Sequence, residues 1–203
     1  MKYFFSCVFL AYSALAAAQA PKPSAYEYRW ALLHPFAALV VNKITKACDQ
    51  DALPKWIQLE LDSFSNGGAA DAFRHVFYMA AYRQKIGERK LRKLGQAHEK
   101  HNYHQFLKDA DEYGERPDSI GSVMDLQNNE VGFEIGRLYK NLSLLELRRA
   151  VIEQIKAGNA FILKRNRNGK YLSCEGEVID LTKYNKTWNI PKCLVYSNYK
   201  AEF

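Results

Sequence analysis

Three short polar clusters interrupt the apolar stretches of the sequence, and their residue types can do chemistry. Their members combine carboxylates with imidazoles, amides and a guanidinium: Asp71, Arg74, His75, His98, Glu99, Asp125, Asn128 and Asn129. Asp71 and His75 are an i, i+4 pair, so in a helix they would share one face. Polar groups beside apolar stripes are costly unless they have partners, so we expect the clusters to act together.

The first chemistry that these residues suit is metal binding. Imidazole and carboxylate ligands contributed by several helices are what a metal site in a helical bundle requires. Such ligands favour zinc, manganese or iron(II). We expect His75, His98 and Asp125 to hold a divalent metal, which would lower the pKa of a bound water. Asp71 can add a ligand or orient His75 from behind.

The remaining polar residues can then take catalytic roles. Glu99 or Asp71 would activate water or orient a ligand. Arg74 would hold a phosphate or carboxylate with two hydrogen bonds. Asn128 and Asn129 would stabilise developing negative charge. These roles predict a metal-dependent hydrolase whose favoured substrates are phosphoesters, such as phospholipid or nucleic acid.

Two other functions fit the same residues. Glu99 and Asp125 can form a glycosidase pair that cleaves the cell wall without a metal. Alternatively, the clusters can form buried hydrogen bonds that hold the helices together in a non-catalytic binding or structural module. Loss of activity on adding a chelator would distinguish the metal-dependent hydrolase from these two alternatives.

Helical periodicity supplies the elements that must position the clusters. Apolar residues recur with helical spacing in five stretches, over residues 30–53, 69–84, 90–111, 123–139 and 143–158. Ser143 and Glu146 form a capping-box pattern at the start of the last stretch. Gly132 and Gly136 fall on the side of their helix that carries Asp125, where they would let another helix or a ligand approach closely.

After Gly158 the pattern changes to short strands. Residues 161–163 and 171–172 flank Asn168-Gly169 and predict a β-hairpin, while 178–181 and 193–196 are further strand candidates. The expected fold is therefore mainly α, a compact bundle of about five helices over residues 24–157. A small β-hairpin lobe would follow over residues 158–203.

The first residues of the chain predict export. Residues 1–20 have a basic start at Lys2, an apolar run and a small-residue stretch with cleavage expected near Ala18, which is the pattern of a signal peptide. The apolar run is too short for a spanning helix, and no later stretch is apolar over 18 residues. We expect a periplasmic or secreted protein without a transmembrane segment in its mature chain.

Export favours a disulfide between Cys174 and Cys193, with Cys48 left as a buried thiol in a helix. The 203 residues are 48% hydrophobic and 25% charged, values that argue against a disordered, collagen-like or coiled-coil chain. The formal net charge of +7 permits an anionic partner such as phospholipid, nucleic acid or cell wall.

The three clusters together also resemble a known family. The motifs N…DAxRH, AHE and MDxxNNxxG, within residues 60–137, are similar to those of an uncharacterised bacterial domain of unknown function. That domain is associated with exported proteins and with C-terminal domains of polymorphic toxins. The resemblance implies an α-helical domain whose functional residues are the eight named above, and it implies no known reaction. A looser similarity is to HD-type phosphohydrolases, from which Glu99 departs because that pattern has Asp.

Overall fold

The computed structural model describes residues 23–50, 60–62, 64–110 and 115–200, so the expected signal peptide lies outside the described residues. The helices in these ranges are α1 (Ala25–Leu33), α2 (Pro35–Gln50), α4 (Ala69–Arg83), α5 (Glu88–Leu107), α6 (Ser119–Leu138) and α7 (Leu144–Lys156). They are followed by strand β1 (Phe161–Leu163), the 3-10 helix η1 (Leu181–Tyr184) and strand β2 (Leu194–Tyr196). The predicted mainly α fold is confirmed. Within the described ranges, no helix is long and apolar enough to cross a membrane.

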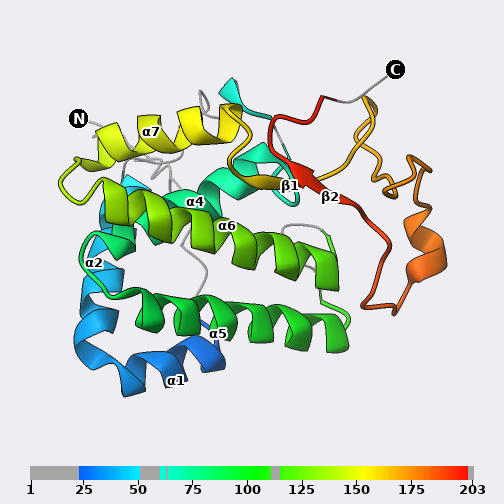
Figure 1. Ribbon diagram of the computed structural model, residues 1–203. Coiled ribbons are helices and arrows are strands. Elements are labelled where there is room, and N and C mark those ends of the chain that lie inside the picture. The colour runs from blue at the N-terminus through cyan, green and yellow to red at the C-terminus, as the bar shows by residue number, and fades with distance from the viewer. Residues whose placement is uncertain (1–22, 51–59, 63, 111–114, 201–203) are drawn as a thin grey trace, which may run out of the picture.

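The bundle is built around α4 and α6, which pack along each other (Figure 1). In the view of Figure 1, α7 lies above this pair and α5 below it, while α2 crosses at one end and α1 lies beneath α5. Buried side chains of α4, α6 and α7 fill the main core: Phe73, Val76, Phe77, Ala80, Ile135, Leu147, Val151 and Ile155. On the α5 side, Met79 of α4 and Phe133 of α6 pack with Leu91 and Leu94 of α5 in a second cluster. The central pair therefore has apolar neighbours on both sides.

Two glycines of α6 set the separation of the central helices. A Cβ on Gly132 would lie 2.6 Å from the carbonyl oxygen of Val76 and 2.8 Å from Cβ of Met79. A Cβ on Gly136 would meet the carbonyl oxygen of Ala80 in the same way. The predicted close approach at these glycines is confirmed, and the element that approaches is α4.

The stretch predicted as helical over residues 30–53 is divided at His34 into two helices, and residues 51–53 lie outside the described residues. α1 ends at Leu33 because His34 precedes Pro35, and a residue before proline is disfavoured in the helical conformation. Pro35 then begins α2, where its missing N–H has no cost. α1 itself starts with a capping box, in which the side chains of Ser24 and Glu27 each bind the other's backbone N–H.

The predicted capping box of the last helix is confirmed, with Ser143 as N-cap and Glu146 as its partner. α6 begins at Ser119, earlier than its apolar pattern predicts. The reason is Asp118, whose side chain accepts a hydrogen bond of 2.8 Å from the N–H of Gly121 and so caps an additional turn.

The C-terminal strands are confirmed in part. β1 forms at the predicted residues, but its antiparallel partner is β2, with Phe161 opposite Tyr196 and Leu163 opposite Leu194. The chain does turn back at Asn168-Gly169, with an antiparallel bridge between Arg165 and Tyr171, but residues 171–172 make isolated bridges and no regular strand. Residues 178–181 make a bridge at Val178 and then enter η1 rather than forming a strand.

A disulfide explains why β2 reaches β1. Cys174 and Cys193 are bonded, as predicted, and they are 19 positions apart. The bond holds the start of β2 beside the segment that follows the Gly169 turn, where the N–H of Cys193 donates to the carbonyl of Leu172. Cys48 is buried in α2 and keeps its thiol.

Candidate metal centre

The first turn of α4 holds a buried carboxylate in a fixed orientation. Gly68 precedes the helix and has no side chain to cap it, so the carboxylate of Asp62 accepts the N–H groups of the first two helical residues at 2.7 and 3.1 Å. Gly67, with a positive φ of 70°, turns its N–H toward Asp71 and donates to Oδ2 at 2.6 Å. Asp71 is therefore positioned by the backbone turn in front of its own helix.

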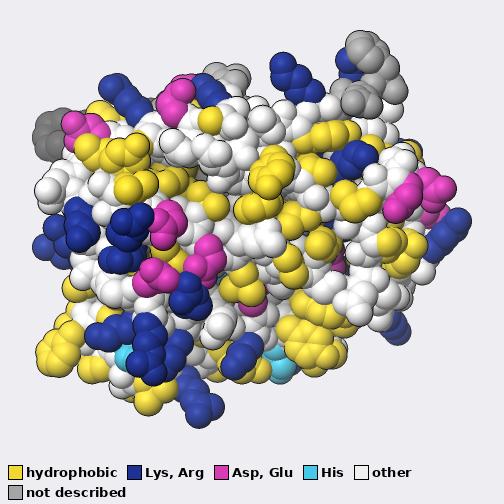
Figure 2. All heavy atoms as spheres, in the orientation of Figure 1, with side chains coloured by type: hydrophobic (Ala, Val, Ile, Leu, Met, Phe, Trp, Pro, Cys, Tyr) yellow, Lys and Arg dark blue, Asp and Glu magenta, His cyan; other side chains and the backbone are white. Residues whose placement is uncertain are grey.

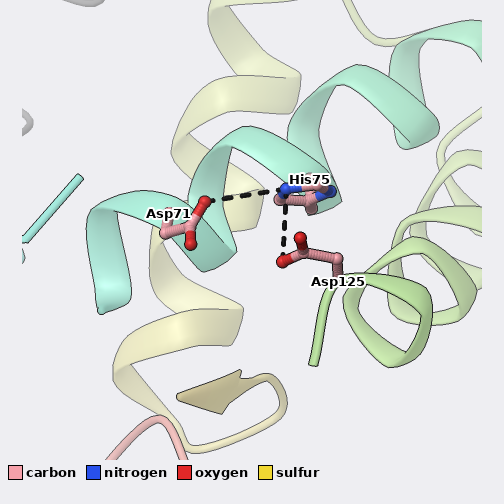
Figure 3. Close-up of side chains that lie close together, drawn as sticks. All are labelled: Asp71, His75 and Asp125. Carbon is pink, nitrogen blue, oxygen red and sulfur yellow. Dashed lines mark ion pairs between the residues drawn. The ribbon is translucent and has the colours of Figure 1, made fainter. Parts of the chain in front are cut away.

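His75 lies between carboxylates from two helices (Figure 3). Its Nε2 is 3.6 Å from Oδ1 of Asp71, one turn back on α4, and 3.3 Å from Oδ1 of Asp125 on α6. One ligand atom from each of the three residues lies within 4.8 Å of the others. The exposed fractions of these side chains are 2% for Asp71, 10% for His75 and 12% for Asp125, so water screens them little.

Asn129 fixes the other side of the His75 ring. Nδ1 of His75 is 3.4 Å from Oδ1 of Asn129, so a proton on Nδ1 would face an acceptor there. Gly95 of α5 makes room for this amide, since a Cβ there would lie 2.7 Å from Nδ2 of Asn129. Burial and the positive charge of Arg74 and His98 lower the pKa of His75 well below its ordinary value. In the neutral tautomer with its proton on Nδ1, the ring would present the lone pair of Nε2 to the carboxylates.

Arg74 balances part of the negative charge. Its guanidinium donates to Oδ1 of Asp71 at 2.5 Å and to the carbonyl of Ser65 at 3.3 Å, and a quarter of its side chain is exposed. Burial raises the pKa of Asp71, while Arg74 and the N–H of Gly67 oppose that rise. When both carboxylates are ionised, their charge exceeds that of the one guanidinium, and a cation between them would neutralise the excess.

His98, predicted as a metal ligand, lies beside the Asp71–His75–Asp125 group and not within it. Its ring centroid is 6.3 Å from that of His75, and its Nδ1 is 3.1 Å from Oε1 of Glu27 on α1. Burial raises the pKa of Glu27, but its hydrogen bonds with His98 and with the backbone of Ser24 outweigh this and bring the value to about 2.

Sequence analysis missed Glu27. The one signal was the S-x-x-E capping pattern, which predicts only a helix start, and the partner is 71 positions away.

Glu99 is buried on α5, with a different neighbour. Its Oε2 accepts a hydrogen bond of 3.2 Å from the amide of Asn102, one turn along the same helix. The described residues that can jointly hold an ion do not include it. Its predicted role as the base that activates water stays a prediction.

Asn128 joins α6 to the C-terminal segment. Its fully buried amide accepts from the N–H of Phe161 at 2.9 Å and donates to the carbonyl of the same residue at 3.0 Å. Two residues further along β1, the N–H of Leu163 donates to the carbonyl of Gly67 at 2.8 Å. β1 thus contacts the turn that positions Asp71, and both ends of the Asn128 amide are used in holding that strand.

A second set of contacts from the C-terminal segment reaches the same turn. Arg165 donates to the carbonyl of Asn66 at 2.8 Å and to the hydroxyl of Tyr171, which donates in turn to Oε2 of Glu115 at 2.6 Å. Glu115, Arg165 and Tyr171 also line a cavity of about 420 Å³. Sequence analysis missed this network because its members are scattered singly along the chain.

Comparison with known proteins adds one finding. No curated protein and no solved structure matches the chain. A family model described as a domain of unknown function, DUF6973, matches residues 28–159, which contain the three polar clusters and almost all of the helical bundle. The expectation of an uncharacterised domain is confirmed at this level. The chain belongs to the DUF6973 family of domains of unknown function.

Proposed function

We propose that the chain is an exported, metal-dependent hydrolase of phosphoesters in which Asp71, His75 and Asp125 bind a divalent metal. One observation carries the proposal. Nε2 of His75 faces carboxylate oxygens of two different helices, at 3.6 and 3.3 Å, while Nδ1 faces the amide oxygen of Asn129.

The arrangement favours a cation because all the inward-facing atoms are electron-rich. A ring nitrogen with a lone pair and two carboxylate oxygens repel one another unless a positive charge lies between them. A metal-binding histidine usually donates its other N–H to an acceptor, and Asn129 supplies that acceptor for His75. One imidazole and two carboxylates suit zinc, manganese or iron(II).

The neighbouring residues supply the other groups that hydrolysis needs. A bound metal would lower the pKa of water and give a nucleophile near neutral pH. Arg74, a quarter exposed, is the cation placed to receive a phosphoryl oxygen. His98, held by Glu27 and one-third exposed, is the best candidate to transfer a proton to or from the substrate.

A phosphoester is the favoured substrate because the chain carries a formal net charge of +7 and a guanidinium stands at the site. Both phospholipid and nucleic acid have the required phosphodiester. Export is supported by the signal-peptide pattern and by the Cys174–Cys193 disulfide, since disulfides persist in oxidising compartments.

The test compares metal content and activity in matched variants. Asp125→Asn keeps the shape of the side chain but removes a charged ligand, and His98→Ala changes a neighbour outside the proposed ligand group. Each protein is reconstituted with zinc, manganese or iron(II), dialysed, and measured by elemental analysis and with an activated phosphodiester. Circular dichroism checks that each variant is folded.

We expect near-stoichiometric metal in the wild type and in His98→Ala, and little in Asp125→Asn. Hydrolysis should fall in both variants and in chelated wild type. Equal metal content in wild type and Asp125→Asn, or none in either, would contradict the metal centre. Cell-wall cleavage that survives chelation would instead support the glycosidase alternative with Glu99 and Asp125.

A further inference from the structure

The corner between α1 and α2 exposes large apolar side chains that the bundle does not cover. Leu32 is 82% exposed, Leu33 68%, Phe36 84% and Leu39 68%. They lie within eight positions of one another, on either side of the His34 break between the two helices. We call these four residues the apolar corner.

The opposite faces of the same helices are packed. Trp30 and Ala37 are buried in a core cluster with Leu91 and Leu94 of α5, and the indole N–H of Trp30 donates to the carbonyl of Lys90 at 2.8 Å. The inward apolar residues therefore account for the attachment of α1 and α2 to the bundle. Packing within the described part of the chain gives no reason for the outward ones.

Basic residues border the apolar corner on both helices. Arg29 lies one turn before Leu32 and Leu33 on the exposed face of α1, and Lys43 lies one turn after Leu39 on the exposed face of α2. The start of α5, against which α1 packs, adds three exposed cations: Arg89, Lys90 and Lys93. Figure 2 shows hydrophobic side chains beside a group of Lys and Arg at this end of the molecule.

Acidic groups are scarce on this face. Among the side chains described in α1 and α2, the acid is Glu27, whose carboxylate accepts from the Ser24 N–H and contacts His98. At the start of α5 the acid is Glu88, which forms an ion pair with Arg92 at 2.6 Å. A protruding set of leucines and a phenylalanine bordered by cations matches the boundary between acyl chains and anionic headgroups of a bilayer. Leu32 and Phe36 are more than four-fifths exposed, an exposure that suits insertion among lipid headgroups.

We propose that the α1–α2 corner docks on the surface of an anionic phospholipid bilayer. Phe36 and the three leucines enter the headgroup region, and Arg29, Lys43 and the cations at the start of α5 contact lipid phosphates. This inference does not depend on the proposed hydrolase activity, because none of the residues that carry it belongs to the metal centre.

The experiment is sedimentation of the folded protein with vesicles. One set of vesicles is phosphatidylcholine alone, and the other is phosphatidylcholine and phosphatidylglycerol in equal parts. The apolar variant is Leu33→Gln with Phe36→Gln, and the charge variant is Arg29→Gln with Lys43→Gln. The matched control is Leu138→Gln with Leu145→Gln, which removes exposed leucines from α6 and α7. Any segment outside the described residues is the same in all four proteins, so it cancels in the comparison.

We expect the wild type and the control to sediment with the anionic vesicles and to be released by salt. Burying a leucine and a phenylalanine is worth enough that the apolar variant should bind more than about tenfold more weakly. The charge variant should bind weakly and lose part of its salt dependence. The proposal is overturned if the wild type stays in solution, or if the control loses as much binding as the apolar variant. It is also overturned if light scattering shows a dimer that only the apolar variant dissociates, since a second copy would then occupy the corner.

Discussion

Replacing Gly132 with alanine should weaken the central helix pair by an amount that its geometry sets. The new Cβ would lie 2.6 Å from the carbonyl oxygen of Val76, which is 0.8 Å inside the 3.4 Å at which ordinary contact begins. A backbone oxygen in a helix cannot rotate away, so α4 and α6 must separate. Overpacking of this kind costs about 3 kcal/mol, and the better helix propensity of alanine returns about 1 kcal/mol.

The expected net loss in the free energy of unfolding is therefore about 2 kcal/mol, which lowers the melting temperature by about 4–8 °C in a chain of this size. Circular dichroism during thermal and urea unfolding measures both quantities. Gly121→Ala is the matched control, because it lies in the same helix and its Cβ would meet only Oδ1 of Asp118, at an ordinary 3.5 Å. That variant should be as stable as the wild type or slightly more stable. If Gly132→Ala were equally stable, the close packing of α4 on α6 would be refuted.

Three more predictions concern other parts of the structure. Asn128→Leu removes both hydrogen bonds between this side chain and the backbone of Phe161. The free energy of unfolding, measured by urea titration, should therefore fall by about 3 kcal/mol. An unchanged urea midpoint would contradict the role of Asn128. Replacing both cysteines of the disulfide with alanine should cost about 3 kcal/mol for its separation of 19 positions, and equal stability of the reduced and oxidised wild type would argue against the bond. The pKa of Glu27 is about 2 against an ordinary 4.5, because hydrogen bonds to His98 and Ser24 outweigh the effect of burial. Since the pKa of Glu27 is lower in the folded state than in the unfolded state, its ionised carboxylate stabilises the fold, by on the order of 3 kcal/mol. This stabilisation is complete above pH 4.5 and is lost as the pH falls toward 2. Glu27→Gln should flatten that part of the stability–pH curve, and a curve identical to that of the wild type would contradict the pairing.

Local signals in the sequence were enough to predict most of the helices. The capping box at Ser143 and the apolar stripe of residues 69–84 depend on neighbours within one or two turns, and both were predicted correctly. Apolar spacing alone did not place the break at His34, because the spacing continues through it; Pro35 was the signal for a helix start there. The pairing of β1 with β2 depends on a disulfide and on Asn128, which are contacts between distant segments.

In the candidate site too, contacts between near neighbours in the sequence were predictable and contacts between distant segments were not. Asp71 and His75 share a helix, so their juxtaposition followed from spacing alone, and Asp125 was expected from its residue type. The position of His98 outside the group was not predictable, because His98 contacts Glu27 of α1, 71 positions away, and no local pattern predicts that contact.

The hydrogen bonds from β1 and Arg165 to the turn before α4 cross the end of the region that the family model covers. The family model ends at residue 159, yet Phe161, Leu163 and Arg165 bind Asn128, Gly67 and Asn66. A chain truncated at residue 159 would keep Asp71, His75 and Asp125 of the proposed metal centre and lose the hydrogen bonds that hold the Asp71 turn. The segment that the family model covers is therefore shorter than the segment that holds this turn in place.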